Sequence, residues 1–547
     1  MNATKIVLIR CPQPMLVGET SGSLYSQNRL LTPEPTLPQL EGILREFSKR
    51  FDVPINVIQL DLRDPTNGPI KAVCYGSLKL PYINEKIDKI YSGADIESLY
   101  EILADADFIG FTNNFCMSRI VVAEHIRKVR NLFPAKELWV GGRDVFTERV
   151  IKVYANAAGN RNFVVFEGHV FDSLPAYLLW KLKNKGKPFG ITIYDEKQKI
   201  SKLAQKPLLA NANKDCEIKI PLPIYHKPES LSYFTCSGEG QPNPPFSRFV
   251  YMTISIGCPY ACGYCTTGQR ERYLVHKDLS TIKKELEMYK RLGVTTIGIM
   301  DDNLLALGPE KVKRIMNLIN SYSFEIEYGN GLQLSLLNKY WDELKNPIFE
   351  RCVSLYAPLE DLTCDRLYEK LDPIALELEL MKKIAREKPG ALRYVTMGVI
   401  IGVPGHTKKA LETAFMENIG KFLDVFFGSK LEVAVTVFNF MPLPGTHFGE
   451  TALNSSRMVM ADPVSKDPEV CSFGTTSYAP EGISHKALFG LYEKALNLNP
   501  AGKELGVSYV KLQRLGEMAV QANERRKVPA QWKIPGLHLR ARVKEKL

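Results

Sequence analysis

The chain has 547 residues, of which 45% are hydrophobic and 24% charged, and its formal net charge is +11. At roughly 100–200 residues per domain, this length indicates about two to four domains. The composition is typical of a soluble globular protein, and no apolar run reaches the roughly 20 residues that a membrane helix needs.

The N-terminal segment indicates a strand rather than a secretory signal, because its apolar run is short and β-branched and no small-residue cleavage site follows. The eleven cysteines are scattered except for one group of three. An odd number of cysteines without regular spacing is typical of a reducing compartment. We therefore expect a cytoplasmic protein without a membrane span.

Residues 1–195 alternate short apolar strands with helical stretches. The predicted elements are, in chain order, Lys5–Ile9, Pro38–Phe51, Ile55–Leu62, Asp107–Thr112, Arg119–Phe133, Glu137–Gly142, Phe163–Phe166 and Leu174–Lys183. This alternation predicts a doubly wound, Rossmann-like α/β domain, whose ligands bind beyond the carboxyl ends of its parallel strands. Those ends carry seven polar or small residues, namely Thr112, Asn113, Asn114, Gly141, Gly142, Glu167 and Gly168.

Residues 196–248 break the pattern with turn-forming proline and glycine, and we predict a linker there. Residues 249–445 return to alternation, which predicts a partial (β/α)6 barrel with its active face at the carboxyl ends of the strands. The predicted strands are Val250–Ile256, Thr295–Met300, Glu325–Tyr328, Cys352–Tyr356, Tyr394–Ile401 and Glu432–Phe440. The predicted helices are Leu279–Leu292, Pro309–Ser321, Cys364–Lys370, Ala375–Arg386 and Lys408–Leu423.

Residues 446–547 are predicted to form a mostly helical C-terminal region, with its clearer helices at Lys486–Leu498 and Tyr509–Arg526. From Lys503 onward the chain carries eleven Lys or Arg and four Glu. Charge runs are usually solvated faces, so a solvated helical tail is the favoured interpretation. Contact with nucleic acid, an acidic leader peptide or an anionic surface is the alternative, and nucleic acid is an unlikely partner because no RNA-binding aromatic motif accompanies the charge.

The three clustered cysteines, Cys258, Cys262 and Cys265, form a CxxxCxxC set on a loop directly after a predicted strand. Thiolates are soft ligands that suit iron–sulfur clusters and zinc. A zinc site would need a fourth Cys or His, and the nearest histidine is His276. Three thiolates on a four-iron cluster leave one iron open to a substrate or cofactor. Three buried or zinc-binding cysteines are the alternative.

This motif resembles the signature of the radical S-adenosylmethionine (SAM) superfamily. The resemblance implies that the three cysteines act in catalysis by holding a [4Fe-4S] cluster, and that SAM chelates the open iron. One electron from a donor such as flavodoxin or ferredoxin then cleaves SAM to a 5′-deoxyadenosyl radical. Tyr264 is similar to the aromatic residue that lies against the adenine in this superfamily.

Further positions resemble SAM contacts of the superfamily. Asp301 and Asp302, at the end of the second predicted barrel strand, match the site that holds the SAM ammonium, and Glu360 matches the ribose contact. Ile400 and Gly402 lie in a glycine-rich run that resembles the segment beside the adenine. An N-cap role for Asp301, a surface position for Glu360 and a packing role for the glycines are the alternatives.

The order of domains resembles the cobalamin-binding subclass of radical SAM enzymes. Trp139–Gly142 (WVGG) and Val164–Gly168 (VVFEG) are similar to two turns of its corrinoid domain, which implies that the seven strand-end residues bind cobalamin, as methylcobalamin. No Asp-x-His-x-x-Gly follows Thr112, so no lower cobalt ligand is offered there, and Arg143–Val145 replaces the commoner Pro-His-Ala type. His125 is expected at the surface. A Rossmann-like domain with another role is the alternative.

The resemblance implies a cobalamin-dependent radical SAM methyltransferase that acts on a carbon centre of a small-molecule, natural-product or peptide substrate. Cyclisation or rearrangement with the same cofactors is one alternative. A radical SAM enzyme that modifies tRNA is another. Enzymes of that kind carry three more cysteines for a second cluster, and Cys11, Cys74 and Cys116 lie in the N-terminal region without their partners at the matching turns. A non-enzymatic cluster-binding protein is a further alternative.

Overall fold

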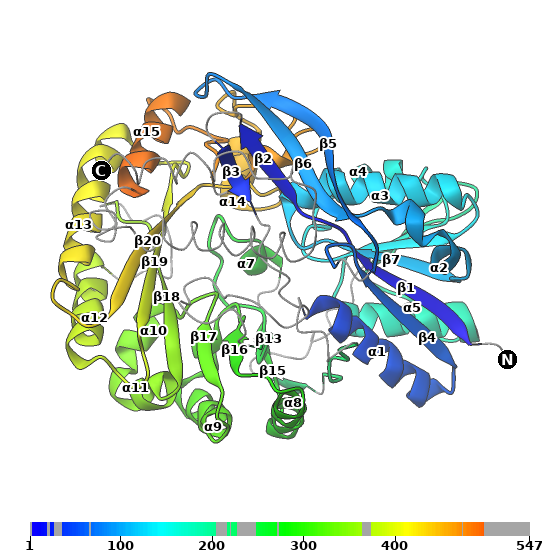
Figure 1. Ribbon diagram of the computed structural model, residues 1–547, viewed down its shortest axis with the longest axis horizontal. Coiled ribbons are helices and arrows are strands. Elements are labelled where there is room, and N and C mark those ends of the chain that lie inside the picture. Colours follow the sequence, from blue (N-terminus) through cyan, green and yellow to red (C-terminus); the bar gives the residue numbers. More distant parts are fainter. Residues whose placement is uncertain are drawn as a thin grey trace.

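A computed structural model of the chain describes residues 3–18, 22–26, 35–64, 67–203, 216–218, 220–226, 248–270, 273–363, 373–472 and 474–496 (Figure 1). The N-terminal half, blue to cyan, lies beside a second half, green to yellow, and elements nearer the C-terminus, in orange, lie between their upper ends. Each half is built on a largely parallel sheet with helices packed against it. The fold is therefore the α/β architecture that the alternating pattern predicts.

The N-terminal half contains a seven-stranded sheet with the order β11-β10-β9-β8-β7-β1-β4. Its strands are β1 (Thr4–Arg10), β4 (Ile55–Asp61), β7 (Phe108–Thr112), β8 (Glu137–Gly141), β9 (Phe163–Phe166), β10 (Ile191–Tyr194) and β11 (Ile200–Leu203). β1 pairs in parallel with β4 on one side and with β7 on the other, so the strand order reverses between β1 and β7. Ligands of doubly wound sheets bind at such a switch point, beyond the carboxyl ends of the strands.

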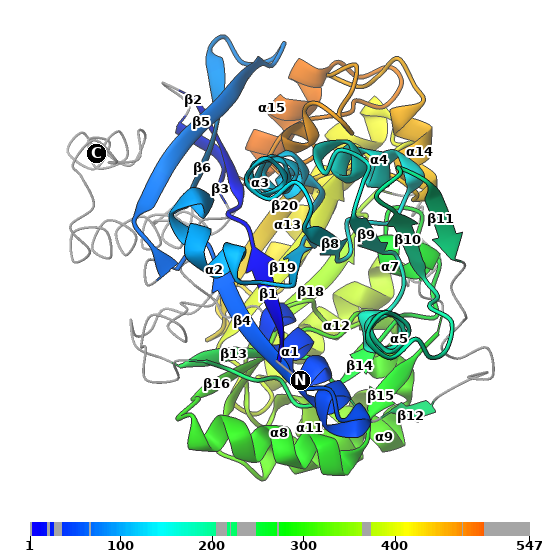
Figure 2. The same cartoon turned by 90° about the vertical axis from the view of Figure 1, so that its right-hand side faces the viewer.

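Helices cover both faces of this sheet (Figure 2). They are α1 (Thr36–Phe51), α2 (Tyr100–Ala104), α3 (Arg119–Leu132), α4 (Glu148–Ala157) and α5 (Val170–Lys183), with 3-10 turns at Ile96–Leu99 and Cys116–Ser118. Leu44 of α1 and Leu178 of α5 pack on one face, whereas Ile126 of α3 and Ile151 of α4 pack on the other. The doubly wound prediction is confirmed. Because β11 pairs with β10, the first residues of the predicted linker belong to this sheet.

A second, antiparallel sheet with the order β3-β2-β6-β5 is inserted into the N-terminal half, and the sequence pattern does not predict it. Its strands are β2 (Pro14–Gly18), β3 (Gly22–Ser26), β5 (Ile70–Lys79) and β6 (Lys86–Ala94). Most of β5 is exposed or half-buried, so its sequence lacks the buried apolar run that marks the parallel strands. The sheet packs through Leu16, Leu78 and Ile87 against Val470 and Cys471, near the C-terminus.

Polar contacts tie the same sheet to the C-terminal region. Lys89 of β6 is largely buried, and its Nζ lies 3.1 Å from Oδ1 of Asp467 and 3.5 Å from Oε2 of Glu469. The hydroxyl of Tyr75 in β5 donates to Oε1 of Glu469 at 2.7 Å. The segment that follows the barrel is therefore held by the N-terminal half.

The second half contains a six-stranded, all-parallel sheet with the order β13-β16-β17-β18-β19-β20, as predicted. Its strands are β13 (Phe249–Met252), β16 (Thr296–Ile299), β17 (Glu325–Tyr328), β18 (Cys352–Glu360), β19 (Tyr394–Ile401) and β20 (Glu432–Asn439). Its helices are α8 (Leu279–Arg291), α9 (Pro309–Asn320), α10 (Leu334–Lys339), α11 (Trp341–Phe349), α12 (Ile374–Glu387) and α13 (Met416–Asp424), with a 3-10 turn at Leu304–Leu307 and a π-helical turn at Ala410–Phe415. The predicted helix Cys364–Lys370 lies outside the described residues.

The first barrel strand is shorter than predicted. The expected strand Val250–Ile256 divides into β13 and β14 (Ser255–Ile256), and β14 joins β15 (Val275–Lys277) and β12 (Cys216–Ile218) in a separate small sheet. Asp301 divides the predicted strand, because its carboxylate accepts hydrogen bonds from the backbone N–H groups of Ile254 and Ser255. These two amides are therefore not available to the barrel sheet.

Beyond the barrel, α14 (His447–Leu453) and α15 (His485–Leu496) are joined by a long irregular segment with one 3-10 turn at Pro468–Val470. Helix α15 confirms the helix predicted at Lys486–Leu498. The predicted helix Tyr509–Arg526 and the basic tail lie outside the described residues. None of the helices in the described part of the chain has both the length and the apolar character that crossing a bilayer requires.

His125 in α3 is buried, so its predicted surface position is wrong. Its Nδ1 lies 2.7 Å from the carbonyl oxygen of Val121, and its ring centroid lies 5.4 Å from that of Tyr91 in β6. The inserted sheet, which the sequence pattern does not reveal, thus covers this face of α3. Burial lowers the pKa of His125 to about 4.

We expect His125 to make the fold sensitive to mild acid. The unfolded chain binds a proton at His125 near pH 6.5 and the folded chain only near pH 4, so the free energy of unfolding falls as the pH falls through this window. Between pH 7 and pH 5 the loss due to His125 is about 2 kcal/mol. Denaturant unfolding of the wild type and of His125→Gln at both pH values measures it. An equal pH dependence of the two proteins would contradict the expectation.

Candidate functional site

The three-cysteine loop connects β14 to a short helix, α7 (Thr266–Arg270), at the carboxyl side of the first barrel strand. Cys262 is buried, whereas Cys258 and Cys265 are half-buried. The backbone N–H of Cys265 donates to the carbonyl of Cys262 at 3.0 Å. The N–H of Phe448 in α14 donates to the carbonyl of Gly263 at 2.8 Å, so α14 closes over the loop.

Residues 301–303, which follow β16 after one intervening residue, contact the cysteine loop and its two ends at three points. Asp301 accepts bonds from Ile254 and Ser255, at the entrance of the loop. Oδ1 of Asp302 accepts a bond from the hydroxyl of Thr267 at 3.3 Å, two residues after the last cysteine. Nδ2 of Asn303 lies 3.7 Å from Sγ of Cys258. This segment therefore positions both ends of the loop.

The environment of Asp301 differs from the one expected for a SAM contact. Its carboxylate is buried, and burial raises its pKa to about 6, although the bonds from Ile254 and Ser255 oppose the shift. Both oxygens accept bonds from the chain itself. The side chain thus serves the shape of the loop, and its predicted contact with SAM stays a prediction.

The three thiols are candidate ligands for a cluster. Among the described residues, no three His, Cys, Asp or Glu side chains lie close enough together to bind one metal ion. In a [4Fe-4S] cluster each thiolate binds a different iron, so the three ligands lie farther apart than around one ion. Three soft thiolates on one partly exposed loop fit a cluster with one open iron.

Tyr264 and Glu360, two predicted SAM contacts, meet in the structure. The Tyr264 hydroxyl donates to Oε2 of Glu360, the last residue of β18. Glu360 is buried and has a φ of 58°, in the left-handed region, next to a register shift between β18 and β19. Strained non-glycine residues of this kind cluster at functional sites. The surface alternative for Glu360 is therefore wrong.

Ile400 and Gly402 lie near Tyr264 but differ in their surroundings. Ile400 belongs to a small apolar cluster that also contains Tyr264 and Phe440. Gly402 has a φ of 85°, and a Cβ at this position would lie 2.7 Å from Cδ2 of Leu488 in α15. The close packing of α15 therefore explains why residue 402 is a glycine. Ile400, by contrast, lies in the same apolar cluster as Tyr264, the predicted adenine contact.

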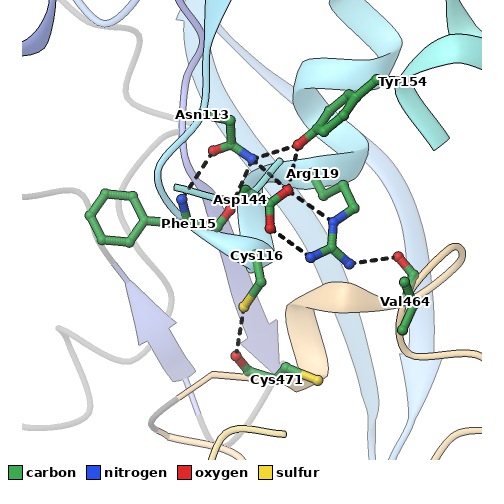
Figure 3. Close-up of polar contacts among 8 residues, drawn as sticks. All are labelled: Asn113, Phe115, Cys116, Arg119, Asp144, Tyr154, Val464 and Cys471. Carbon is green, nitrogen blue, oxygen red and sulfur yellow. Dashed lines mark hydrogen bonds and ion pairs between the residues drawn. The ribbon is translucent and has the colours of Figure 1, made fainter. Parts of the chain in front are cut away.

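The loops after β7 and β8 are joined by a buried polar network (Figure 3). Nδ2 of Asn113 lies 2.8 Å from the hydroxyl of Tyr154 and 3.2 Å from Oδ2 of Asp144. Arg119 pairs with Asp144 through two bonds, of 2.6 and 2.9 Å, and donates to the carbonyl of Val464 at 2.8 Å. The pKa of Arg119 is raised, because the attraction of Asp144 outweighs the desolvation that opposes it. Asn113, predicted as a cobalamin contact, has its amide within this network.

Gly142 allows the same two loops to approach each other. Its φ is 117°, and a Cβ would lie 2.1 Å from the carbonyl oxygen of Asn113. Gly141 precedes it and pairs with Thr112 in the sheet register, and its carbonyl accepts a bond from Asn113 N–H at 2.9 Å. Four of the predicted residues, Thr112, Asn113, Gly141 and Gly142, are therefore brought together.

A small pocket lies at the switch point between β1 and β7. Its lining residues are Arg10, Cys11, Gln13, Thr112, Asn113, Asn114, Phe115, Ser118 and Val122. Three of them are predicted site residues, and the Phe115 ring, 37% exposed, points away from the buried network (Figure 3). The sequence reasoning missed Arg10 and Gln13. The switch-point rule itself would have indicated them, because it points to the end of β1 as well as the end of β7.

Glu167 and Gly168 lie outside this pocket. The Glu167 carboxylate accepts a bond from the hydroxyl of Thr192 and lies 4.0 Å from Nζ of Lys202. The backbone N–H groups of Glu167 and Gly168 both donate to the carbonyl of Gly190. The Glu167 side chain is thus directed toward β10 and β11, so the structure does not bring these two predicted residues to the others.

Arg143 joins the two halves of the molecule and was not among the predicted site residues. Its guanidinium makes two bonds to Asp302, with Nη1 3.1 Å from Oδ1 and Nη2 3.0 Å from Oδ2. Its backbone N–H donates to Oδ1 of Asn114 at 3.1 Å. A continuous path of hydrogen bonds therefore runs from the loop after β8, through Arg143 and Asp302, to Thr267, two residues after the last cysteine.

No protein-family model matches the chain. Among curated proteins, the tRNA-2-methylthio-N(6)-dimethylallyladenosine synthase of Thermus thermophilus is 22% identical over 218 residues. The match covers 38% of this chain and 43% of the synthase, which is less than half of that relative's length.

Solved structures resemble the chain over a greater length. The radical S-adenosylmethionine methyltransferase TsrM from Kitasatospora setae, with cobalamin and a [4Fe-4S] cluster bound, is 12% identical, with a TM-score of 0.60 over 91% of this chain and 92% of that chain. The same enzyme with tryptophan substrate and the SAM analogue aza-SAM has a TM-score of 0.54 over 83% of this chain and 77% of that chain. The cobalamin-dependent S-adenosylmethionine radical enzyme OxsB is 13% identical, with a TM-score of 0.50 over 92% and 62%. At such identity the likeness shows a shared fold.

Proposed function

We propose that this chain, whose fold is that of cobalamin-binding radical SAM enzymes, is a cobalamin-dependent radical SAM methyltransferase. Its substrate would be a carbon centre of a small molecule, natural product or peptide. The observation that carries the proposal is the three-cysteine loop at the barrel rim, which Asp302 and Arg143 join to the strand-end loops of a Rossmann-like sheet. Such sheets bind their ligands at those loops.

In this proposal Cys258, Cys262 and Cys265 hold the cluster and leave its fourth iron to SAM. The SAM contacts that we propose are Tyr264, Asp301, Asp302, Glu360, Ile400 and Gly402. Of these, Tyr264 and Glu360 have the strongest support, because they are bonded to each other beside the cysteine loop. Asp302 would have to exchange Arg143 or Thr267 for the SAM ammonium. When bound, the cluster and SAM would supply one-electron chemistry and cobalamin a transferable methyl group.

The proposed cobalamin contacts are Thr112, Asn113, Asn114, Gly141, Gly142, Glu167 and Gly168. The pocket at the switch point favours the first three, and Arg10, Gln13 and Phe115 extend it. None of the residues that line this pocket is a histidine. Glu167 and Gly168 have the weakest support, because they face β10 and β11.

Replacement of Cys262 by alanine is expected to abolish cluster binding, because the two remaining thiolates are too few to bind the [4Fe-4S] cluster stably. Anaerobic reconstitution with iron, sulfide and cobalamin, followed by iron analysis and absorbance, measures it. The wild type should bind about four irons and one cobalamin per chain. Cys352→Ala is the matched control, because Cys352 is buried in β18 and should leave the cluster intact. A wild type that binds neither group would refute the proposal.

The reaction itself has two alternatives to radical methylation. Cyclisation or rearrangement would use the same cofactors without a net methyl transfer. A polar methylation would yield S-adenosylhomocysteine alone, whereas a radical route also yields 5′-deoxyadenosine. Product analysis with flavodoxin or ferredoxin as the proposed electron donor separates these routes.

A tRNA-modifying enzyme is the second candidate, because the T. thermophilus synthase is among the curated proteins that this chain resembles. A second cluster would need Cys11, Cys74 and Cys116 to lie together. Cys11 and Cys116 are buried in two different apolar clusters, and Cys74 is exposed in β5. This arrangement favours one cluster. About eight irons per reconstituted chain instead of about four would favour the tRNA-modifying enzyme.

A further inference from the structure

We propose that Asn303 raises the reduction potential of the cluster by donating a hydrogen bond from its side-chain amide to the sulfur of Cys258. The inference rests on the proposed function only for the presence of the cluster. It assigns Asn303 a positioning and tuning role that the resemblance to radical SAM enzymes does not supply.

The side-chain amide of Asn303 directs one of its hydrogens toward the sulfur of Cys258. Asn303 follows Asp302 at the carboxyl end of β16 and is 5% exposed. Its Nδ2 lies 3.7 Å from Sγ of Cys258 and 2.8 Å from Oε1 of Gln333. An amide nitrogen carries two hydrogens, so each of the two acceptors receives one.

The neighbours of the amide favour this orientation over the flipped one. Nε2 of Gln333 donates to the hydroxyl of Ser335 at 2.8 Å, which leaves Oε1 of Gln333 to face Asn303. A flipped Asn303 would set its oxygen against that oxygen. Nδ2 is therefore the atom of Asn303 that faces both Gln333 and the cysteine sulfur.

The oxygen of the same amide supports a role beyond packing. Oδ1 of Asn303 is buried and has no hydrogen-bond partner in the part of the chain that the structure describes. A buried, unsatisfied carbonyl costs about 1–3 kcal/mol. Such groups are rare in folded proteins, and functional sites are among the places where they occur.

A hydrogen bond to a ligand sulfur changes the energy of cluster reduction. The cluster takes one electron from an external donor, such as a flavodoxin or ferredoxin, and no bond forms or breaks in this step. The reduced cluster carries one more negative charge, which the N–H stabilises. Removal of the bond should therefore lower the potential. The hydrogen bonds given above for Asp301 and Asp302 go to Ile254, Ser255 and Thr267, whereas that of Asn303 goes to Sγ of Cys258.

The test is a redox titration of the reconstituted full chain without SAM, monitored by electron paramagnetic resonance. Asn303→Leu keeps the size of the side chain but removes the donor. Asn330→Leu is the matched control, because the Asn330 amide is exposed and bonds the carbonyl of Met300 at 3.0 Å, beside the same segment but away from the sulfurs. We expect the midpoint potential to fall in Asn303→Leu and to stay at the wild-type value in Asn330→Leu.

The outcomes separate this inference from the proposed function. A wild type that holds a cluster, with an unchanged or higher potential in Asn303→Leu, overturns the inference alone. An equal fall in both variants overturns it as well, because the effect would then not come from the sulfur contact. If Asn303→Leu loses the cluster, Asn303→Asp, which places a carboxylate oxygen near the thiolate, must show the fall, and an unchanged potential there overturns the inference. A wild type without a cluster overturns the proposed function.

Discussion

Arg119→Met is expected to lower the free energy of unfolding by about 3–5 kcal/mol, the usual cost of breaking a buried ion pair. Arg119 and Asp144 are 1% and 3% exposed at their side chains and share two hydrogen bonds (Figure 3). Methionine preserves the volume of the arginine stem but leaves the Asp144 carboxylate buried without its cation. The hydroxyl of Tyr154, 2.5 Å from Asp144, cannot supply the missing charge.

Denaturant unfolding of three proteins tests this expectation. The double variant Arg119→Met with Asp144→Leu should lose less stability than Arg119→Met alone, because two apolar groups leave no unpaired charge. If Arg119→Met lowered the free energy of unfolding by less than about 1 kcal/mol, the Arg119–Asp144 pair would contribute no more than a solvent-exposed ion pair does. That result would contradict the expectation.

Under the proposed function, Arg143→Gln is expected to slow methyl transfer from SAM to the bound corrinoid by about 10- to 100-fold, with little change in stability. The Arg143 side chain is 49% exposed, and exposed ion pairs contribute about 0–1 kcal/mol. The pair nevertheless connects the loop after β8 with the segment that positions the cysteine loop. A misplacement of reacting groups by about 1 Å costs about 100-fold in rate.

The rate of this half-reaction can be followed by the absorbance of reconstituted protein without knowledge of the substrate. Arg143→Lys should fall between the wild type and Arg143→Gln, because lysine keeps the charge but not the two-pronged bond. Arg149→Gln is the control, because Arg149 is exposed in α4. Wild-type rates in Arg143→Gln, or equal losses in Arg149→Gln, would contradict the expectation. Cluster and cobalamin contents must match in all four proteins.

The fold can be predicted from the sequence where the strands are buried on both faces of the sheet. β1, β9 and β19 have runs of apolar or β-branched residues, and their bounds are close to the predicted ones. The inserted sheet escapes prediction because β5 is largely exposed and β2 follows β1 after only three residues. The burial of His125 escapes for the same reason, since β6 covers it.

The candidate site also has a part that the sequence predicts and a part that it does not. The cysteine loop and Tyr264 follow from local spacing, because the ligands of the cluster lie within eight residues of one another. Arg143 and Asp302 are 159 positions apart, and Arg119 and Val464 are 345 apart. Such pairs form only in the folded protein, where the two sheets lie side by side, so no local sequence pattern predicts them. The roles of Asp301 and Gly402 depend on what packs against them.

The clasp between Lys89, Tyr75 and the pair Asp467 and Glu469 limits how this protein can be recombined with its relatives. A chimaera that exchanges the segment after the barrel would leave Lys89 facing the residues of another protein. Functional hybrids should therefore arise when the β5–β6 hairpin is transplanted together with that segment. By the same logic, positions 89 and 469 should change in concert over evolutionary time.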